Sequence, residues 1–402
     1  MDTVQVAEPS SKSDEGVITN MSVQVGGKHL LPLTNKLPRI LLINAYDMKK
    51  VSEMYSRGTF PGHHLFGAHE LAEDYGMNIL IQQHEKYTFL NWLGKWFDVA
   101  LLDQQIRALV TLREGDIVYA PFAATNTKLI LMAKWFGFID NPIVILVHQP
   151  LFGLPSKNRL IRFLASKLIP NFNTIIFFSQ KLKEEVMSWY NPPEEKRYFH
   201  FSPLGVDLEF FKNHKAQENA IPYVISSGNT GRDFDILIKA AQRVNCLFKI
   251  YCKPESFPKS AQVPENVEIL SGEFPFRQIC EDIASARLVL IPLTANPQGT
   301  IGLISLLEAL ALGKPIIMTK NKYIDVDFEK ENIGVTVEEN DIDGWAHAIA
   351  SLIDDDKRLK VMGDNSLRLA KSSLNINIFA KELALAIEDT YRRYNSGKSR
   401  QS

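Results

Sequence analysis

The stretch that decides the fold spans residues 296–315 and reads NPQGTIGLISLLEALALGKP. A loop containing Gly299 and Gly302 leads into an apolar helix that ends at Gly313, directly before an apolar strand. The free backbone N–H groups at the start of such a helix suit an anion such as a diphosphate. Glu308 lies further along the helix among apolar residues, where a carboxylate needs a hydrogen-bonding partner such as a ribose diol. A plain amphipathic helix with Glu308 on a solvated face explains this segment about equally well.

Outside this segment, apolar runs alternate with helix-length amphipathic stretches from residue 37 onward. This alternation is typical of a parallel sheet covered by helices on both faces. The runs form two series, separated by a polar stretch around residues 213–219. We therefore predict an α/β protein with two Rossmann-like, doubly wound domains, whose strands end on either side of a ligand-binding cleft. The predicted strands are 39–44, 78–81, 116–119, 143–147, 174–178, 223–226, 248–251, 267–270, 288–291, 315–318 and 334–337.

The composition of the chain indicates where these domains begin and end. The polar amino-terminal segment lacks the apolar core of a secretory signal, so we treat it as flexible. A long amphipathic stretch near the carboxyl terminus predicts a helix that packs back on the first domain. The predicted divisions are a flexible extension 1–36, an amino-terminal domain 37–208, a hinge 209–220, a carboxyl-terminal domain 221–377, and a final helix and tail 378–402.

Length and charge exclude several classes of protein. The 402 residues exceed the roughly 250–300 at which one core stops growing, and 45% hydrophobic residues exclude bulk disorder. Lys+Arg 45 against Asp+Glu 46 leaves no global basic field for nucleic acid. Three cysteines without a CxxC pair favour a reducing, cytoplasmic compartment. Because no apolar stretch reaches about 18 residues, we expect no membrane-spanning segment.

Two further residues stand where ligands bind in such a fold. His148 directly follows the strand 143–147, and Arg232 directly follows Gly231, four positions after Gly228, in the loop after the strand 223–226. A guanidinium can hold two phosphate oxygens at once, and the glycines allow the backbone to approach a ligand. The alternatives are a structural histidine and a surface ion pair of Arg232 with a neighbouring aspartate.

These residues carry a resemblance to a known family. The stretch 296–315 resembles the donor-site motif of GT-B glycosyltransferases, in particular the family-four (glycosyl transferases group 1) enzymes, which have two glutamates eight positions apart before a Gly-Lys-Pro turn. Four other segments are similar to family motifs in the right order, and together they cover residues 38 to about 395. They are GHHL at 62–65, PIVILVHQ at 142–149, SPLGVDLEFF at 202–211 and SGNTGRD at 227–233.

The resemblance implies a GT-B architecture and a transferase, with EC class 2.4 chemistry, that moves a sugar from a nucleoside diphosphate sugar to an acceptor with retention. Glu308 would bind the ribose, Arg232 the diphosphate, and His148 the sugar from across the cleft. The leaving phosphate would help deprotonate the acceptor. Further donor contacts would come from Gly228, Gly299, Thr300, Ile301 and Gly302, and Gly62 and His63 would form the amino-terminal glycine loop, opening a helix after the first strand.

The sequence departs from the family pattern at two places. Thr300 stands eight positions before Glu308, where the family has its first glutamate, a contact of the transferred sugar. Only Arg232 is clearly placed for the phosphates, where many relatives use an arginine and a lysine. The alternatives are a non-catalytic GT-B partner that regulates another glycosyltransferase and a nucleotide-sugar epimerase.

We expect no metal and no other cofactor. Asp325 and Asp327 alone are weak evidence for a divalent cation. The spacings of His63, His64 and His69 do not align two imidazoles on one helix face, as a zinc site on a helix requires.

A basic amphipathic helix in the amino-terminal domain suggests where an acceptor could be presented. A helical wheel over residues 157–168 places Leu160, Ile161, Leu164 and Leu168 on one face. The segment carries the four cations Lys157, Arg159, Arg162 and Lys167 and no acid, with Trp92, Trp96, Phe97, Trp135 and Phe136 in nearby segments. Such a helix suits an anionic membrane surface, with a saccharide or lipid-linked acceptor of polysaccharide or glycolipid biosynthesis at the inner face of the membrane. A core-packing helix with solvated cations is an equal alternative.

Overall fold

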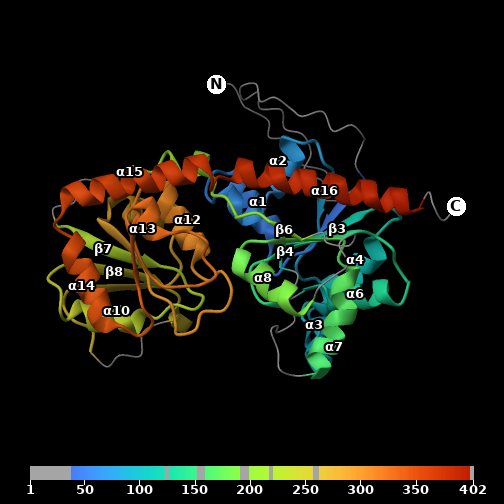
Figure 1. The fold of residues 1–402 in the computed structure, drawn as a ribbon, viewed down its shortest axis with the longest axis horizontal. Coiled ribbons are helices and arrows are strands. Elements are labelled where there is room, and N and C mark those ends of the chain that lie inside the picture. Colours follow the sequence, from blue (N-terminus) through green and yellow to red (C-terminus); the bar gives the residue numbers. More distant parts are fainter. Residues whose placement is uncertain are drawn as a thin grey trace, which may run out of the picture.

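The computed structural model describes residues 38–122, 126–151, 159–190, 199–216, 221–256 and 262–398. These residues form two six-stranded sheets, one in each half of the chain, with helices packed around them (Figure 1). All strand pairs in both sheets are parallel. The predicted fold class is therefore confirmed.

The first sheet has the strand order β2-β1-β3-β4-β5-β6. The order in which successive strands are added reverses between β1 and β3. Its strands are β1 (Ile40–Leu42), β2 (Ile79–Ile81), β3 (Ile117–Ala120), β4 (Ile143–Val147), β5 (Thr174–Phe177) and β6 (Phe199–Phe201). The sequence does not predict β6, because this short edge strand is largely exposed and has no continuous apolar run. The other five strands lie where the apolar runs place them.

The second sheet has the strand order β12-β11-β10-β7-β8-β9. The order in which successive strands are added reverses between β10 and β7. All six of its strands were predicted, each within one residue at either end. They are β7 (Tyr223–Ser227), β8 (Leu247–Cys252), β9 (Val267–Ser271), β10 (Leu288–Ile291), β11 (Ile316–Thr319) and β12 (Gly334–Val337). Ligands in such sheets bind at the point where the strand order reverses, which here is where the loops after β7 and β10 meet.

Helices cover both sheets. In the amino-terminal half they are α1 (Met48–Ser56), η1 (Gly62–Leu65), α2 (Ala68–Glu73), α3 (Thr88–Trp96), α4 (Leu102–Thr111), α6 (Lys128–Trp135), α7 (Arg159–Leu168), η3 (Ile169–Asn171), α8 (Gln180–Trp189) and α9 (Leu208–Phe211). In the carboxyl-terminal half they are α10 (Phe234–Ala241), η5 (Pro254–Ser256), α11 (Phe276–Ser285), α12 (Leu303–Ala311), α13 (Phe328–Glu331), α14 (Ile342–Leu352), α15 (Asp356–Ser372) and α16 (Ile376–Lys398).

One apolar cluster extends through both domains. It includes Leu204 and Phe211 from the end of the first domain and Leu306 and Leu307 from α12, all fully buried. The helices α9 and α12 pack against each other. This shared core holds the carboxyl ends of the two sheets close together and so positions the cleft.

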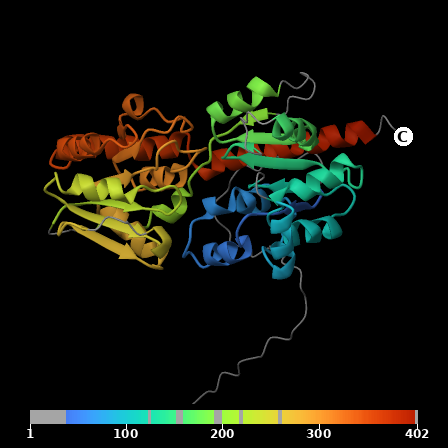
Figure 2. The same cartoon turned by 90° about the horizontal axis from the view of Figure 1, so that it is seen from below.

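The chain returns to the first domain at its end. While α15 lies along the second domain, α16 lies along the first (Figures 1 and 2) and packs on α2 and β5. At the crossing, the N–H of Val206 donates to the carbonyl of Leu374 at 2.8 Å, and that of Ile376 donates to the carbonyl of Val206 at 2.9 Å. Within the described residues, no helix is both long enough and apolar enough to cross a bilayer.

Candidate active site

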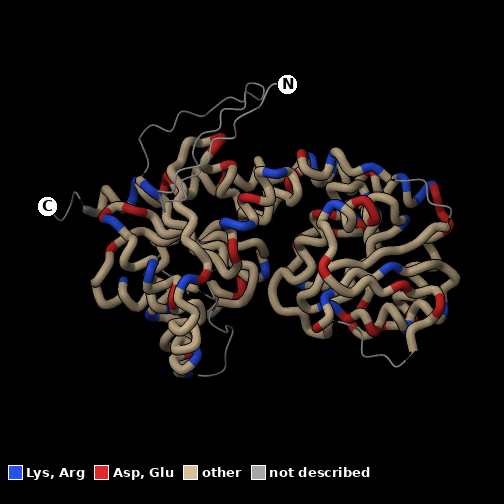
Figure 3. The backbone as a smooth tube through the Cα atoms, turned by 180° about the vertical axis from the view of Figure 1, so that it is seen from behind, with Lys and Arg blue, Asp and Glu red and all other residues tan. Residues whose placement is uncertain are grey.

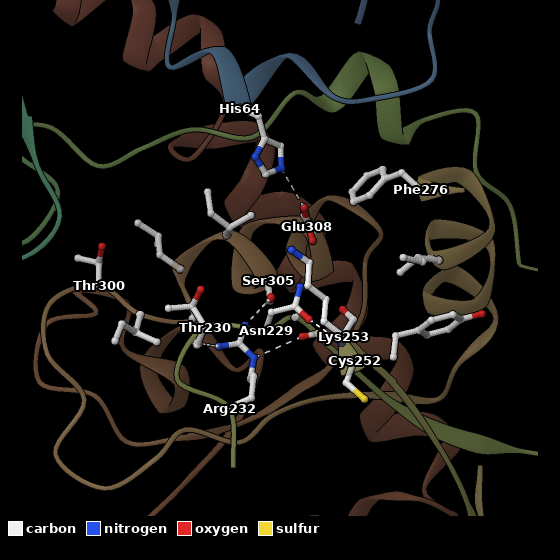
Figure 4. Close-up of a pocket in the computed structure, with 18 of the residues that line it drawn as sticks. His64, Asn229, Thr230, Arg232, Cys252, Lys253, Phe276, Thr300, Ser305 and Glu308 are labelled. Carbon is white, nitrogen blue, oxygen red and sulfur yellow. Dashed lines mark hydrogen bonds and ion pairs between the residues drawn. The ribbon is translucent and has the colours of Figure 1, made fainter. Parts of the chain in front are cut away.

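A cavity of about 680 Å³ lies between the two domains, at the carboxyl ends of both sheets (Figure 4). The amino-terminal domain contributes mostly aromatic residues: Phe60, His64, Phe66, Phe122, His148, Gln149, Phe178 and Leu204. The polar and charged residues of the carboxyl-terminal wall include Ser227, Asn229, Thr230, Arg232, Lys253, Glu273, Thr300, Ser305 and Glu308.

Arg232 is held in the wall of this cavity by three hydrogen bonds. Its Nη2 donates to Ser305 Oγ at 2.7 Å, its Nε to the Ser227 carbonyl at 3.3 Å and its Nη1 to the Thr230 carbonyl at 3.1 Å. A guanidinium has five N–H groups, so donors remain for a ligand. Burial lowers the pKa of Arg232 to about 10 while Glu308 raises it, so the group stays charged at neutral pH.

Gly228 gives the guanidinium its place. Its φ of +118° lies in the region that favours glycine, and a Cβ there would lie 2.7 Å from Arg232 Nη2. A larger residue at this position would displace the arginine from the cavity wall.

Glu308 is buried, with 6% of its surface exposed, so the alternative that places it on a solvated face is wrong. Its Oε1 lies 3.7 Å from His63 Nε2 and 3.6 Å from His64 Nε2, both in η1 on the opposite side of the cleft (Figure 4). Burial raises the pKa of Glu308, but the nearby His63 and His64 more than offset this and hold it at about 2. Glu308 is therefore an ionised acceptor facing the cavity.

His63, His64 and Glu308 are also the residues that could hold a metal, because their ligand atoms lie within 4.8 Å of one another. The Nδ1 of His63 accepts a hydrogen bond from the backbone N–H of Asp207 at 3.5 Å, which leaves the proton of a neutral ring on Nε2. This nitrogen lies 3.7 Å from Glu308 Oε1, and neither His63 Nε2 nor His64 Nε2 has a hydrogen-bond partner among the described residues. A nitrogen that carries a proton is not a metal ligand, so this tautomer disfavours a metal at the cluster. His69 lies apart from it and packs on Tyr55.

The loop before α12 contacts the opposite domain directly. The backbone N–H of Thr300 donates to the His148 carbonyl at 2.8 Å, and its hydroxyl lies 3.3 Å from the same oxygen. Gly299 has a φ of +70°, and a Cβ there would lie 2.2 Å from that carbonyl. The buried amide of Asn321 donates to the Gly299 and Ile301 carbonyls, each at 3.0 Å.

Gly302 caps α12, which begins at Leu303. In the described structure, the N–H groups of Ile304 and Ser305 in the first turn have no backbone partner, and both residues line the cavity. Free N–H groups at the start of a helix suit an anion, and here they lie close to the Arg232 contact with Ser305.

His148 lies at the back of the cavity among aromatic rings. Its ring centroid is 4.4 Å from that of Phe122 and 6.5 Å from that of Phe178. This enclosure lowers the pKa of His148 to about 4, so the imidazole is neutral near pH 7. Its Nδ1 has no hydrogen-bond partner among the described residues.

The predicted glycine loop at Gly62 and His63 differs in local structure from the expected helix start. Helix α1 follows the first strand, and Gly62 starts a single 3-10 turn, η1, in place of the expected helix. The N–H of Gly62 donates to Asp207 Oδ2 at 2.8 Å. The turn directs His64 into the cavity, whereas Gly62 and His63 lie behind it. Sequence reasoning missed Lys253, Ser305 and Asn229, because single polar residues after a strand or within a helix carry no pattern.

The basic helix α7 is exposed on its apolar side as well. Leu160 and Leu164 have 63% and 43% of their surface exposed, so the core-packing alternative is wrong for them. Among the side chains that the structure describes in this segment, Ala165 and Ile169 are buried. The cations Arg159, Arg162 and Lys167 lie on α7, whereas Lys157 lies outside the described residues.

Other exposed aromatic residues lie on α3 and α6, on the side of the amino-terminal domain away from α16 (Figure 1). They include Phe89, Trp92 and Trp96 on α3 and Trp135, Phe136 and Phe138 at the end of α6. Acidic and basic residues are otherwise interspersed over both domains (Figure 3). Aromatic exposure therefore distinguishes this face more than charge does.

Comparison with known proteins agrees with this geometry. Residues 259–368, which include α12 and Glu308, match the model of the family "Glycosyl transferases group 1". These residues form a glycosyl transferases group 1 domain, and the two facing parallel sheets have the GT-B architecture. The chain is a glycosyltransferase. No curated protein sequence matches the chain.

Solved structures share the fold across nearly their whole length. HepE from Anabaena, solved with UDP-glucose, is 16% identical with a TM-score of 0.62, covering 87% of this chain and 99% of that one. The α,α-trehalose-6-phosphate synthase of Burkholderia multivorans is 11% identical with a TM-score of 0.64, covering 91% and 99%. WaaG, a glycosyltransferase involved in lipopolysaccharide biosynthesis, is 14% identical with a TM-score of 0.55, covering 87% and 99%. At these identities the likeness extends to the fold alone.

Proposed function

We propose that this glycosyltransferase binds a nucleoside diphosphate sugar on its carboxyl-terminal wall and transfers the sugar, with retention, to an acceptor held by the amino-terminal domain. The observation that carries the proposal is the cavity in which Arg232, the start of α12 and the ionised Glu308 line one wall. Arg232 and the N–H groups of α12 bind the diphosphate, and Glu308 accepts hydrogen bonds from the ribose hydroxyls.

The reacting side of the cavity offers few groups for proton transfer. No carboxylate lines the amino-terminal wall among the described residues, and the low pKa of His148 makes it a weak base. The leaving phosphate is then the group that accepts the acceptor proton, while Arg232 stabilises the charge that develops on it. The neutral His148 contacts the sugar.

Thr300 supports a changed sugar subsite. Its N–H and its hydroxyl both donate to the His148 carbonyl, so the hydroxyl oxygen can still accept one hydrogen bond but has neither the charge nor the second oxygen of a glutamate. The contact of a family glutamate with the sugar is therefore replaced here by the Thr300 hydroxyl, the loop backbone or His148.

We further propose that the acceptor is a lipid-linked saccharide or glycolipid at an anionic membrane surface. Exposed aromatics on α3 and α6 and the mixed apolar and basic surface of α7 support this, because aromatic rings and cations suit the membrane interface. WaaG, whose fold is similar, acts in lipopolysaccharide biosynthesis.

A ligand panel tests the donor assignment. UDP, GDP, ADP and their common sugar conjugates are added to the purified protein, and the thermal shift and calorimetric affinity are measured. One nucleoside diphosphate class should raise the melting temperature clearly, and its sugar conjugate should be turned over with an acidic glycolipid acceptor. No thermal shift and no measurable binding with any of the nucleotides would contradict the proposal and favour a non-catalytic partner.

Flotation with liposomes tests the membrane part separately. The parent should float with acidic vesicles at low salt, because each cation near an anionic surface contributes about 1 kcal/mol. A variant with Arg159, Arg162 and Lys167 replaced by glutamine should float less, and a variant with Trp92 and Trp96 replaced by serine should also be weakened. A parent that stays in solution would contradict the membrane proposal.

A further inference from the structure

The diphosphate part of the cavity has one fixed arginine, and the neighbouring helix supplies no second cation. Helix α10, which follows Arg232, buries Phe234, Leu237 and Ile238 in the core. Its one lysine, Lys239, is exposed and does not line the cavity. A nucleoside diphosphate carries more negative charge than Arg232 alone offsets.

Lys253 lines the same cavity and comes from a different element. It follows β8 directly, and β8 lies next to β7, whose loop carries Arg232. The backbone N–H of Lys253 donates to Asn229 Oδ1 at 2.9 Å, and Asn229 belongs to the Arg232 loop. This bond fixes the lysine backbone relative to the arginine.

The side chain of Lys253 is free to meet a ligand. Its ammonium makes no ion pair or hydrogen bond with the described residues, and the side chain extends into the cavity (Figure 4). Lys249 lies on β8, four residues earlier, and differs: its Nζ lies 3.6 Å from Asp282 Oδ1 and 4.4 Å from the ring centre of Tyr223. Lys249, which does not line the cavity, therefore contacts neighbouring side chains, whereas the ammonium of Lys253 does not.

The charges of the cavity lining balance only when Lys253 is included. The fully charged lining residues are the cations Arg232 and Lys253 and the acids Glu273 and Glu308. Without Lys253 the lining would carry a net negative charge facing an anionic ligand, which is unfavourable in a partly enclosed site.

We propose that Lys253 is the second cation of the diphosphate site. The inference rests on the proposed function of the cavity. Lys253 binds phosphate oxygens with its flexible ammonium, while Arg232 holds them from a fixed position. The second positive charge thereby comes from the residue that follows the neighbouring strand β8.

Calorimetric titration of UDP, GDP and ADP, with the matching monophosphates and nucleosides, tests this. With the diphosphate that binds the parent most tightly, Lys253→Ala should raise Kd about ten-fold, with a smaller effect on the monophosphate and none on the nucleoside. Lys253→Arg should restore most of the affinity. Lys239→Ala, which removes an exposed lysine of the same domain, is the matched control and should leave all three values unchanged.

The outcomes separate this inference from the proposed function. A parent that binds none of the three diphosphates would overturn both. A parent that binds, with a Lys253→Ala variant of equal affinity, would overturn the role of Lys253 alone. Equal losses for nucleoside and diphosphate would indicate a structural effect on the loop and would also overturn it.

Discussion

The two walls of the cavity differ in chemistry although both are built on the same kind of sheet. The carboxyl-terminal wall presents a fixed guanidinium, free N–H groups and a carboxylate at strand and helix ends. The amino-terminal wall presents phenylalanine rings and the imidazoles of His64 and His148. This difference is what the proposed function requires, with the charged donor on the carboxyl-terminal wall and the reacting sugar and acceptor against the aromatic wall.

Removing the arginine should cause the largest change. Arg232→Ala should weaken binding of a nucleoside diphosphate by roughly 10- to 150-fold, because a hydrogen bond to a charged group contributes about 1.5–3 kcal/mol. Calorimetry measures the loss, and Arg232→Lys should recover part of it. An unchanged affinity in the folded variant would mean that the charged wall does not bind phosphate.

Replacing Glu308 should weaken the binding of the ribose and leave the diphosphate contacts intact. Glu308→Gln should lower the affinity for the ribonucleoside diphosphate about ten-fold, because the carboxylate accepts hydrogen bonds that the amide accepts less well. It should have little effect on the 2′,3′-dideoxy analogue, which lacks the hydroxyl donors. Comparing the two ligands by calorimetry isolates the contact, and an equal loss for both would contradict the ribose role.

These two residues also show how far sequence reasoning reaches. Arg232 was predicted because it follows glycines in a loop after a strand, and Glu308 because a carboxylate among apolar helix residues needs a partner; both also match the family motif, and each of these signals is local. The strands followed from their apolar runs, except β6, whose exposed edge residues carry no such signal.

The contacts between the domains could not be predicted in this way. The approach of His63 and His64 to Glu308, and of Thr300 to the His148 carbonyl, depends on how two separately folded domains pack. No periodicity within either segment encodes that packing. The same holds for Lys253, whose position becomes meaningful only once β8 lies beside β7.

The aromatic wall should be visible in the pH dependence of stability. The pKa of His148 is lowered to about 4, so below its ordinary value of 6.5 the unfolded chain binds the proton more readily than the folded one. Stability should therefore fall as pH drops from about 6.5 to 4. His148→Gln should make that loss shallower, by up to about 1.4 kcal/mol per pH unit, in urea unfolding followed across this range. Parallel curves for parent and variant would contradict the enclosure of His148.

Removing or adding divalent metal should have the smallest effect on nucleotide affinity. Because the proton on His63 Nε2 disfavours a metal at the cluster, we predict that EDTA leaves nucleotide affinity unchanged within error and that added Mn²⁺ does not raise it. Calorimetry with chelated and metal-supplemented protein measures this. A large gain with metal would show that the cluster or the diphosphate site holds a cation.

The most direct test of the donor wall is a calorimetric titration of UDP, GDP and ADP into the parent and into the Arg232→Ala/Glu308→Gln double variant. The account predicts that one diphosphate binds the parent with a single-site isotherm, that its affinity falls with added salt, and that the double variant binds it at least about 100-fold more weakly. Equal binding by parent and double variant, or no binding of any diphosphate by the parent, would contradict the claim that the charged wall holds the donor.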